Sequence, residues 1–310
     1  MVNDSSRAVR SENRLDLKRY LEERKTAVDR AIRDYLPEPR GPASELIKAM
    51  RYSLLAGGKR LRPILCLAGA EAVGGAWRDA MPVACALEFI HSYSLIHDDL
   101  PVMDDDALRR GVPTNHMVYG EAMALLAGDG LLTEAFRLLS AEETVSGISE
   151  RRILRVIRLI ARASGYQGMV GGQAVDIRSE GRSLDLETLR YMHACKTGAL
   201  ITASVTVGAL LGGGDEHQVA ALRSYGERIG LAFQIADDIL DVEGDAEMMG
   251  KAAGSDQRKE KSTYPAVVGL HESKSLQAQL VQSAIDFLEP FDVKADPLRL
   301  IAKYIIERNK

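Results

Sequence analysis

The chain has few cysteines, few aromatic residues and no long uncharged apolar run. Its three cysteines, Cys66, Cys85 and Cys195, are unevenly spaced in apolar surroundings. This suits buried, reduced thiols better than a disulfide framework or a zinc site. The first residues, MVNDSSRAVRSEN, lack the apolar core of a signal peptide, and no apolar run approaches the roughly 20 residues that span a bilayer. We therefore expect a soluble, cytoplasmic protein without stable membrane insertion.

An excess of positive charge is also absent. The sequence has 40 Lys and Arg against 44 Asp and Glu, for a net charge of −4, so no nucleic-acid partner is expected. Because 46% of the residues are hydrophobic, the chain is able to bury a sizeable core. No low-complexity linker or short repeat divides it. We expect one domain over residues 14–310, after a disordered tail at 1–13.

Strand-like alternation is scarce, whereas helical periodicity is frequent. A first helix over about 17–35 is ended by Pro37. Ser44 is expected to cap a second helix that runs to the Gly57-Gly58 turn. The segment from Pro82 is apolar nearly all round, as in a helix at the centre of a large protein. Further helices are predicted at about 114–140, 149–163, 165–177, 185–211, 216–242, 262–270, 276–288 and 296–308. The pattern predicts an all-α bundle.

The apolar central helix ends in an acidic cluster, HDDLPVMDDDALRRG (97–111). Acidic side chains are almost never buried unless they are paired or bound to a cation. Glu88, His91, Leu95 and Asp98 follow steps of three and four and share one stripe. A hydrogen-bonded core network also explains this stripe, and a solvated helix end explains Asp104–Asp106. Neither explains why the helix before them is so apolar.

A second acidic cluster, QIADDILD (234–241), lies on another apolar helix. Asp237 and Asp241 are one turn apart on the same face, where two carboxylates repel unless they are protonated or a hard cation lies between them. Pro101 interrupts the first helix, which lets the chain bring Asp104 back beside the preceding aspartates. We expect the aspartates of both clusters to lack basic partners in the core. Together they predict a magnesium site.

A phosphate shared with magnesium needs cationic partners, and basic residues occur in several turn-like contexts. Each alone is a weak signal, since a surface lysine or arginine is usually only solvated. Together with the two acidic clusters, they describe a pocket for magnesium and diphosphate that is walled by apolar helices. They are Lys59, Arg60 and Arg62 in GGKRLRP, Arg109 and Arg110 after the first cluster, Lys196 in CKTGAL, and Lys251 and Lys261 beyond the second cluster.

This constellation resembles the short-chain trans-isoprenyl diphosphate synthases, and the bacterial farnesyl diphosphate synthases in particular. The similarity runs from about residue 43 to the C-terminus. Terpene cyclases share the first kind of motif but carry an Asn/Ser/Glu motif where this chain has DDILD. One departure is Ala107, where the acidic run of the family often has a further Asp. The motifs that carry the resemblance are GGKRLRP (57–63), HDDLPVMDDDALRRG (97–111), GMVGGQAVDI (168–177), KTG (196–198), FQIADDILD (233–241) and KSTYP (261–265).

The resemblance implies an all-α isoprenoid-synthase-type bundle around a deep central cavity, usually homodimeric, and it implies roles for individual residues. Two sets of aspartates would hold three Mg²⁺ ions. Two ions would be bound by Asp98, Asp99 and Asp104, and the third by Asp237 with Asp238 and Asp241. Two sets of basic residues would hold the diphosphates. The allylic diphosphate would be held by Arg109, Lys196, Lys251 and Lys261. The diphosphate of isopentenyl diphosphate would be held by Lys59, Arg62, His91 and Arg110. Thr197 and Gln234 would lie against the reacting carbons. The residues expected to act in catalysis are Asp98, Asp104, Arg109, Lys196, Thr197, Gln234 and Asp237.

The implied activity is a magnesium-dependent condensation of isopentenyl diphosphate with dimethylallyl or geranyl diphosphate, by ionisation, addition and deprotonation. In this family, the residues four and five places before the first motif form the floor of the pocket, and here they are Ser94 and Tyr93. The bulk of Tyr93 resembles the farnesyl-producing type and favours a C15 product. The alternatives are that Tyr93 is ordinary core packing, and that the enzyme makes a C20 or C10 diphosphate.

Two other classes of protein are alternatives to an isoprenyl diphosphate synthase. A di-iron bundle needs a Glu-x-x-His pair on each of two helices and two further glutamates. Glu88 and His91 supply one such pair, and the sequence contains no second. A non-catalytic isoprenoid-binding subunit tends to lose motif aspartates or the arginine pair, and both are intact here. The sequence therefore favours an enzyme.

Overall fold

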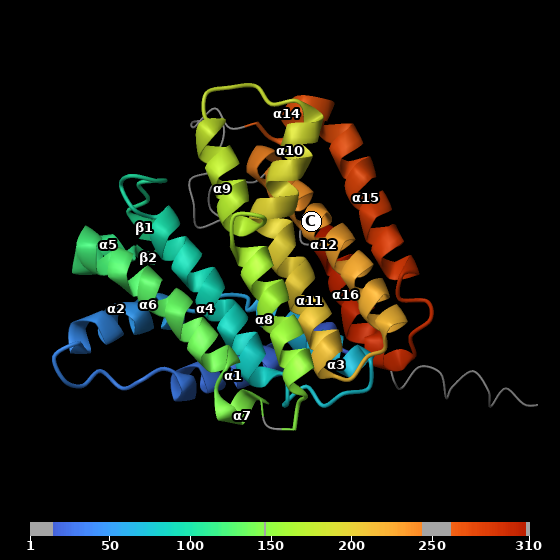
Figure 1. Cartoon of the computed structure of the whole chain (residues 1–310). Coiled ribbons are helices and arrows are strands. Elements are labelled where there is room, and N and C mark those ends of the chain that lie inside the picture. Colours follow the sequence, from blue (N-terminus) through green and yellow to red (C-terminus); the bar gives the residue numbers. More distant parts are fainter. Residues whose placement is uncertain (1–14, 146, 244–261, 308–310) are drawn as a thin grey trace, which may run out of the picture.

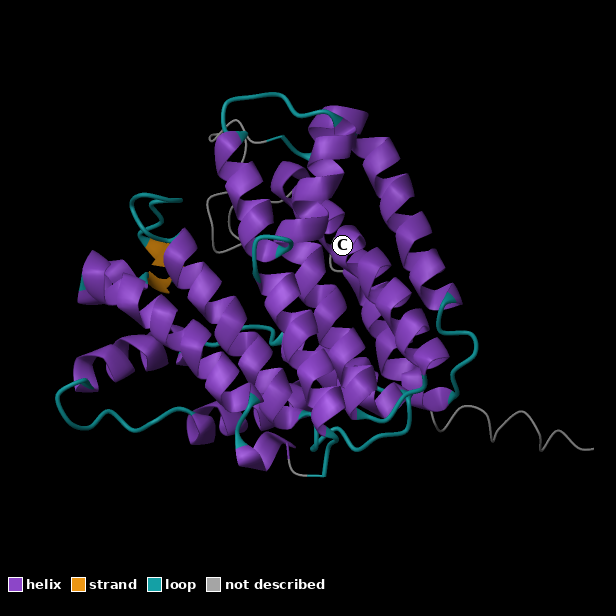
Figure 2. Cartoon of the chain, in the orientation of Figure 1, coloured by secondary structure: helices purple, strands orange, loops and turns teal. Residues whose placement is uncertain are grey.

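Helices make up nearly all of the secondary structure (Figure 2). The structure is a computed structural model that describes residues 15–145, 147–243 and 262–307. Within these residues, the one sheet is an antiparallel pair in which Leu108 pairs with Pro113 and Arg109 with Val112. The all-α prediction is confirmed. The tail predicted at 1–13 lies outside the described residues.

The helices follow one another along the chain, and the hairpin is inserted after the fourth (Figure 1). In chain order, the elements are α1 (Leu17–Tyr35), α2 (Ser44–Leu55), α3 (Leu61–Ala72), α4 (Met81–Asp98), β1 (Leu108–Arg109), β2 (Val112–Pro113), α5 (Asn115–Tyr119), α6 (Glu121–Leu139), α7 (Glu142–Val145), α8 (Glu150–Ser164), α9 (Met169–Arg178), α10 (Leu186–His193), the π-helical turn η1 (Ala194–Gly198), α11 (Ala199–Leu211), α12 (Glu216–Glu243), α14 (Tyr264–Val268), α15 (Leu270–Asp286), the 3-10 turn η2 (Val293–Ala295) and α16 (Asp296–Glu307).

The structure divides two of the predicted helices. The segment predicted as 114–140 forms α5 and α6, which meet at Gly120, where φ is 82°. The segment predicted as 185–211 forms α10, η1 and α11. A positive φ is readily adopted by glycine, and π-helical turns occur inside longer helices, frequently at functional sites. Hydrophobic periodicity does not reveal either kind of interruption.

One expectation near the N-terminus was wrong, and one helix there was not predicted. Ser44 is the first residue of α2 and not its cap, since Ala43 occupies the cap position and no side chain bonds to the helix end. Helix α3 has no counterpart among the predicted helices. Its sequence, LRPILCLAGAEA, is apolar on nearly all sides and therefore gives no amphipathic period. Pro63 lies in its first turn, where a backbone N–H is not needed.

Helix α11 lies at the centre of the bundle and packs against α3, α8 and α12 (Figure 1). The backbones of α3 and α11 meet at glycines. A Cβ on Gly208 would lie 2.0 Å from the carbonyl oxygen of Cys66, and one on Gly69 would lie 2.5 Å from that of Val205. Any larger residue would force the two helices apart. Buried side chains from α1 through α16 join in one hydrophobic cluster.

The stretch Leu186–Leu211, which includes α10, η1 and α11, is long and apolar enough to cross a membrane by length and composition. Of its 18-residue apolar window, 61% is buried inside the structure, which is how the core helix of a bundle packs. The cysteines are free thiols, as expected: Cys66 and Cys85 are buried, whereas Cys195 is only partly buried. Burial raises the pKa of the Cys66 thiol, so it stays protonated.

Candidate active site

A cavity of about 520 Å³ lies between α4, α9, η1 and α12. It confirms the predicted central cavity, and its size is typical of small-molecule sites. Its lining brings together eight residues from the predicted set, namely Arg62, His91, Tyr93, Ser94, Asp98, Lys196, Thr197 and Asp237. The apolar part of the wall comes from Met103, Met169, Val170, Ala174, Ile177 and Phe233, which the sequence analysis did not assign.

The first acidic motif folds back on itself, as the position of Pro101 predicts. Helix α4 ends at Asp98, and the backbone N–H of Asp104 then donates to the carbonyl oxygen of Asp98 over 2.8 Å. The N–H of Asp105, which has a φ of 53°, donates to the carbonyl of Leu100 over 3.1 Å. The spacer thus forms a tight turn that returns Asp104 to the end of α4.

The Asp98 carboxylate lines the cavity in an unfavourable setting for its charge. Burial raises the pKa of Asp98 to about 6, and the charges of Asp104 and Asp99 act in the same direction. Lys196 opposes them. Carboxylates gathered in this way favour a cation that neutralises them.

Asp99 departs from the expectation that the aspartates lack basic partners. It is 3% exposed, and its Oδ1 accepts from Nε of Arg109 at 2.6 Å and lies 2.5 Å from Nη2 of the same residue. Arg109 also lies 3.5 Å from Asp106. The arginine reaches Asp99 because the β1–β2 hairpin turns the chain back over the end of α4. Arg109 is therefore held in place by the motif itself.

The second acidic motif contains one inward-facing carboxylate, Asp238, which is 2% exposed. Its Oδ1 accepts from Nε2 of Gln234 at 3.0 Å, and its Oδ2 accepts from the N–H of Tyr264 at 2.9 Å. Nε2 of His193 lies 3.4 Å from the same Oδ2. Both oxygens of Asp238 thus have protein partners, which disfavours the metal contact implied for it. Asp238 instead ties α12 to the start of α14.

The other two aspartates of this motif have a different setting. Asp237 lines the cavity. One carboxylate oxygen of Asp241, Oδ2, is buried without a hydrogen-bond partner. Such an atom costs free energy unless a donor or a cation completes it. Among the described residues, no group of three or more His, Cys, Asp and Glu is close enough to hold a metal alone. Neighbouring carboxylates from two helices fit Mg²⁺, which keeps waters and shares substrate oxygens.

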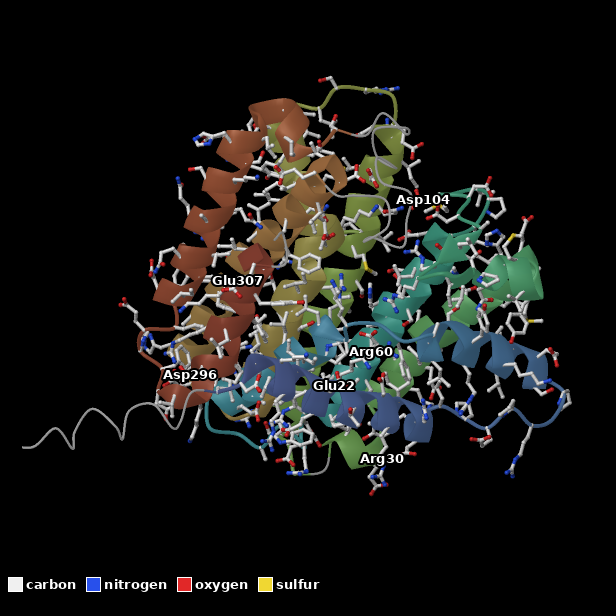
Figure 3. The ribbon with its side chains drawn as sticks, turned by 180° about the vertical axis from the view of Figure 1, so that it is seen from behind. Glu22, Arg30, Arg60, Asp104, Asp296 and Glu307 are labelled. Carbon is white, nitrogen blue, oxygen red and sulfur yellow. The ribbon has the colours of Figure 1, made fainter. Side chains whose placement is uncertain are left out.

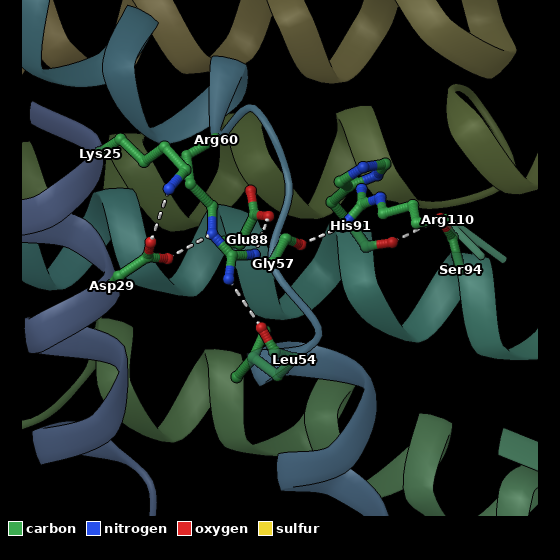
Figure 4. A network of polar contacts seen from close by, with 9 residues as sticks. All are labelled: Lys25, Asp29, Leu54, Gly57, Arg60, Glu88, His91, Ser94 and Arg110. Carbon is green, nitrogen blue, oxygen red and sulfur yellow. Dashed lines mark hydrogen bonds and ion pairs between the residues drawn. The ribbon is translucent and has the colours of Figure 1, made fainter. Parts of the chain in front are cut away.

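A cationic wall lies beside the acidic motifs. Arg62 and His91 line the cavity, and Arg110 donates to the carbonyl oxygen of Gly57 (Figure 4). Burial, together with the charges of Arg62 and Arg110, holds the pKa of His91 well below its ordinary value. Burial also lowers the pKa of both arginines, and Nε of Arg62 is buried without a hydrogen-bond partner. Cations crowded in this way suit an anionic ligand.

Arg60, labelled in Figure 3, lies in GGKRLRP with Arg62. Its side chain faces the core and not the cavity (Figure 4). It adopts a left-handed φ of 50°, and its side chain contacts Asp29 at 2.7 Å, Glu88 at 2.7 Å and the carbonyl of Leu54 at 2.8 Å. Glu88 therefore belongs to a hydrogen-bonded core network, which is one of the two interpretations of the polar stripe on α4. Because its carboxylate is already paired with Arg60, Glu88 is not available as a ligand of a di-iron site. Lys59 lies on the wall of a second cavity, of about 510 Å³, which Phe233 also lines.

The π-helical turn η1 presents two of the predicted residues. Nζ of Lys196 donates to Oδ2 of Asp176 at 2.6 Å, and the hydroxyl of Thr197 donates to Oε1 of Gln234 at 2.9 Å. A Cβ on Gly172 of α9 would lie 2.2 Å from the backbone nitrogen of Lys196, so α9 approaches η1 closely. Asp176 lies in the motif GMVGGQAVDI, but no sequence signal distinguished it as a partner of Lys196. Lys251 and Lys261 lie outside the described residues.

Comparison with known proteins decides the family. The model of the family "Polyprenyl synthetase" matches residues 43–295. The chain is 48% identical over 300 residues to a farnesyl diphosphate synthase from Geobacillus stearothermophilus, which corresponds to 95% of this chain and 99% of that protein. The chain belongs to the polyprenyl synthetase family. The resemblance that the motifs carry is thereby confirmed.

Other members of the polyprenyl synthetase family are similar to the chain along nearly its whole length. A geranylgeranyl diphosphate synthase from Cyanophora paradoxa is 47% identical over 291 residues, covering 94% of this chain and 96% of that one. The crystal structure of an FPP/GFPP synthase from Zymomonas mobilis superposes with a TM-score of 0.85 at 40% identity, covering 93% of this chain and 98% of the other. Since their names specify different products, family membership does not by itself define the product length.

Proposed function

We propose that this polyprenyl synthetase condenses isopentenyl diphosphate with dimethylallyl or geranyl diphosphate to give farnesyl diphosphate and diphosphate. One observation carries the proposal. Two acidic motifs, from the ends of α4 and α12, and a cationic wall meet at a single cavity whose remaining surface is apolar. Such a cavity suits a ligand that has a diphosphate head and a hydrocarbon tail. The name of the Geobacillus stearothermophilus relative gives the same activity.

Three Mg²⁺ ions are expected at the acidic motifs. Asp98 and Asp104 would hold two of them, with Asp99 acting mainly through Arg109. Asp237 and Asp241 would hold the third, with Asp238 fixing their helix against α14. When bound, Mg²⁺ neutralises the charge that grows on the allylic diphosphate as its C–O bond breaks.

Basic residues of the chain hold the allylic diphosphate in line with the metal site. Arg109 is oriented by Asp99 and Lys196 by Asp176, so both cations are positioned before substrate arrives. Lys251 and Lys261, which the resemblance to the family assigns to the same diphosphate, would bind it together with Arg109 and Lys196. The preorganised charges favour the breaking of the C–O bond, because no reorientation is needed as negative charge develops.

The second diphosphate, that of isopentenyl diphosphate, binds at the cationic wall of Arg62, His91 and Arg110, with Lys59 at its edge. Thr197 lines the cavity and donates to Oε1 of Gln234, and both residues would lie against the reacting carbons. The apolar wall keeps water from the carbocation. The departing diphosphate accepts the proton that completes the reaction.

The site works in a soluble, cytoplasmic homodimer that needs no nucleic acid. Exposed apolar side chains on α5 and α6 support the dimer: Met117 and Leu126 are 58% and 51% exposed, and Val118 and Leu125 are also exposed. A second copy of the chain would cover this surface. Sedimentation analysis of the purified protein tests this, and a monomer at micromolar concentration would contradict it.

Product analysis tests the proposed activity. The purified protein is incubated with Mg²⁺, labelled isopentenyl diphosphate and either dimethylallyl or geranyl diphosphate, and the products are sized after dephosphorylation. We expect C15 as the main product from both starters. A main product of C20 or C10 would contradict the chain length only. The absence of any condensation would indicate a non-catalytic isoprenoid-binding subunit.

A further inference from the structure

Tyr93 forms part of the cavity wall, and a second aromatic ring packs against it. Tyr93 and His97 lie four residues apart on α4, which places them on one face of the helix. Their rings meet edge to face, with 5.7 Å between the centroids and an interplanar angle of 78°. Both residues line the cavity. The position of the tyrosine ring is therefore linked to that of the imidazole.

The imidazole is in turn held by α6. Nε2 of His97 lies 3.0 Å from the carbonyl oxygen of Leu125, and because a carbonyl only accepts, Nε2 carries the proton. Gly128, one turn further along α6, supplies the space for the ring. A Cβ on Gly128 would lie 2.1 Å from Nε2 and 2.4 Å from Cδ2. The glycine thus forms a notch that only a residue without a side chain can provide.

We propose that His97 is a positioning residue for product length: seated in the notch at Gly128 and bonded to Leu125, it fixes Tyr93 at the floor of the cavity. The tyrosine alone does not define the depth, because a ring that could swing away would open the space behind it. The contact with α6 prevents that movement. This inference rests on the proposed function, since it assigns a specificity role within the same site.

Two substitutions are expected to change the product length in opposite directions. His97→Ala removes the ring that packs against Tyr93, so the floor deepens and the share of products longer than the wild-type product rises. Gly128→Ala pushes the imidazole out of its notch toward the cavity, so the share of shorter products rises. We expect changes of about tenfold in the product ratios, as for one methylene-sized change in an apolar pocket.

A matched control and a double variant make the test specific. Gly130 also lies on α6, but a Cβ there would meet Sδ of Met50 at 3.0 Å, at the end of a flexible side chain. Gly130→Ala should leave the product ratio unchanged. In the double variant H97A/G128A, the second substitution should have no further effect, because no imidazole remains to be displaced.

The measurement is the product distribution from labelled isopentenyl diphosphate and geranyl diphosphate, at equal extents of conversion. Wild-type product lengths in both single variants would overturn the inference, and so would an equal effect of Gly128→Ala with and without His97. If Gly128→Ala does not yield folded protein, His97→Ala decides alone. A wild-type protein that forms no product contradicts the proposed function, whereas an active wild type with unresponsive variants contradicts only the role of His97.

Discussion

The backbone N–H of Asp104 donates to the carbonyl oxygen of Asp98 over 2.8 Å, although five residues separate them in the sequence. This bond closes the turn that contains Pro101, and it places the second carboxylate of the first motif beside the end of α4. The turn matters because the metal site needs oxygen ligands that converge, and an uninterrupted helix would carry Asp104 away from Asp98.

The geometry of this turn predicts different outcomes for neighbouring aspartates. Asp104→Asn should lower turnover by about 10³-fold, as expected when a charge that stabilises the transition state is lost. Asp105→Asn should leave turnover nearly unchanged, because Asp105 is exposed and asparagine tolerates its positive φ. Steady-state kinetics at saturating Mg²⁺ compare the two. Similar losses in both variants would contradict the assignment of Asp104.

Asp98 is expected to destabilise the metal-free protein at neutral pH. Its folded-state pKa of about 6 lies above the ordinary value of 3.8 for an aspartate, so its charge is less favourable in the folded state than in the unfolded one. Asp98→Asn should therefore raise the melting temperature in EDTA at pH 7 while it abolishes activity.

The difference in stability between the wild type and Asp98→Asn should depend on pH. The stabilisation by Asp98→Asn should be complete above about pH 6, decline as the pH falls through that value, and vanish below about pH 4, where Asp98 is protonated in both states. Thermal unfolding from pH 4 to pH 8 measures this. A stabilisation that grows toward low pH would contradict the account.

The Arg60–Glu88 pair is expected to contribute to folding. Both side chains are 2% exposed, so Glu88→Gln would leave a buried guanidinium with one charged partner fewer. The free energy of unfolding should fall by about 3 kcal/mol, as for other broken buried pairs. The control is Glu23→Gln, which breaks the exposed Arg19–Glu23 pair and should lower the free energy of unfolding far less, because solvent screens that pair. Denaturant unfolding measures both, and equal losses would argue against the buried network.

Tyr93 is expected to limit the length of the product. It is 6% exposed and lines the cavity, so Tyr93→Ala should open the floor and allow products longer than C15. Ser94→Ala is the matched control, since its hydroxyl only donates to the backbone carbonyl of His91 and its truncation opens little space. Sizing of the products from geranyl diphosphate distinguishes the two variants. If Tyr93→Ala still stops at C15, the floor lies elsewhere.

Much of this architecture can be predicted from the sequence, because charged residues on otherwise apolar helices are unusual. Asp98 and Asp237 could be assigned to one site since carboxylates on apolar helices need a cation. The pairing of Asp99 with Arg109 could not be predicted, because it depends on a hairpin of two two-residue strands that has no hydrophobic period. The inward orientation of the Asp238 side chain could not be predicted either, because its partner Tyr264 lies 26 residues away in the sequence. Helix α3 was missed because a segment that is apolar on all sides carries no period.

The most direct test of the central claim compares turnover in the wild type with that in Asp98→Ala and Asp237→Ala. The two residues come from different helices and line one cavity. If the acidic motifs form one magnesium and diphosphate site, incorporation of labelled isopentenyl diphosphate should fall by about 10³-fold or more in each variant, while circular dichroism shows an intact helical fold. Near-normal incorporation in either variant would contradict the account.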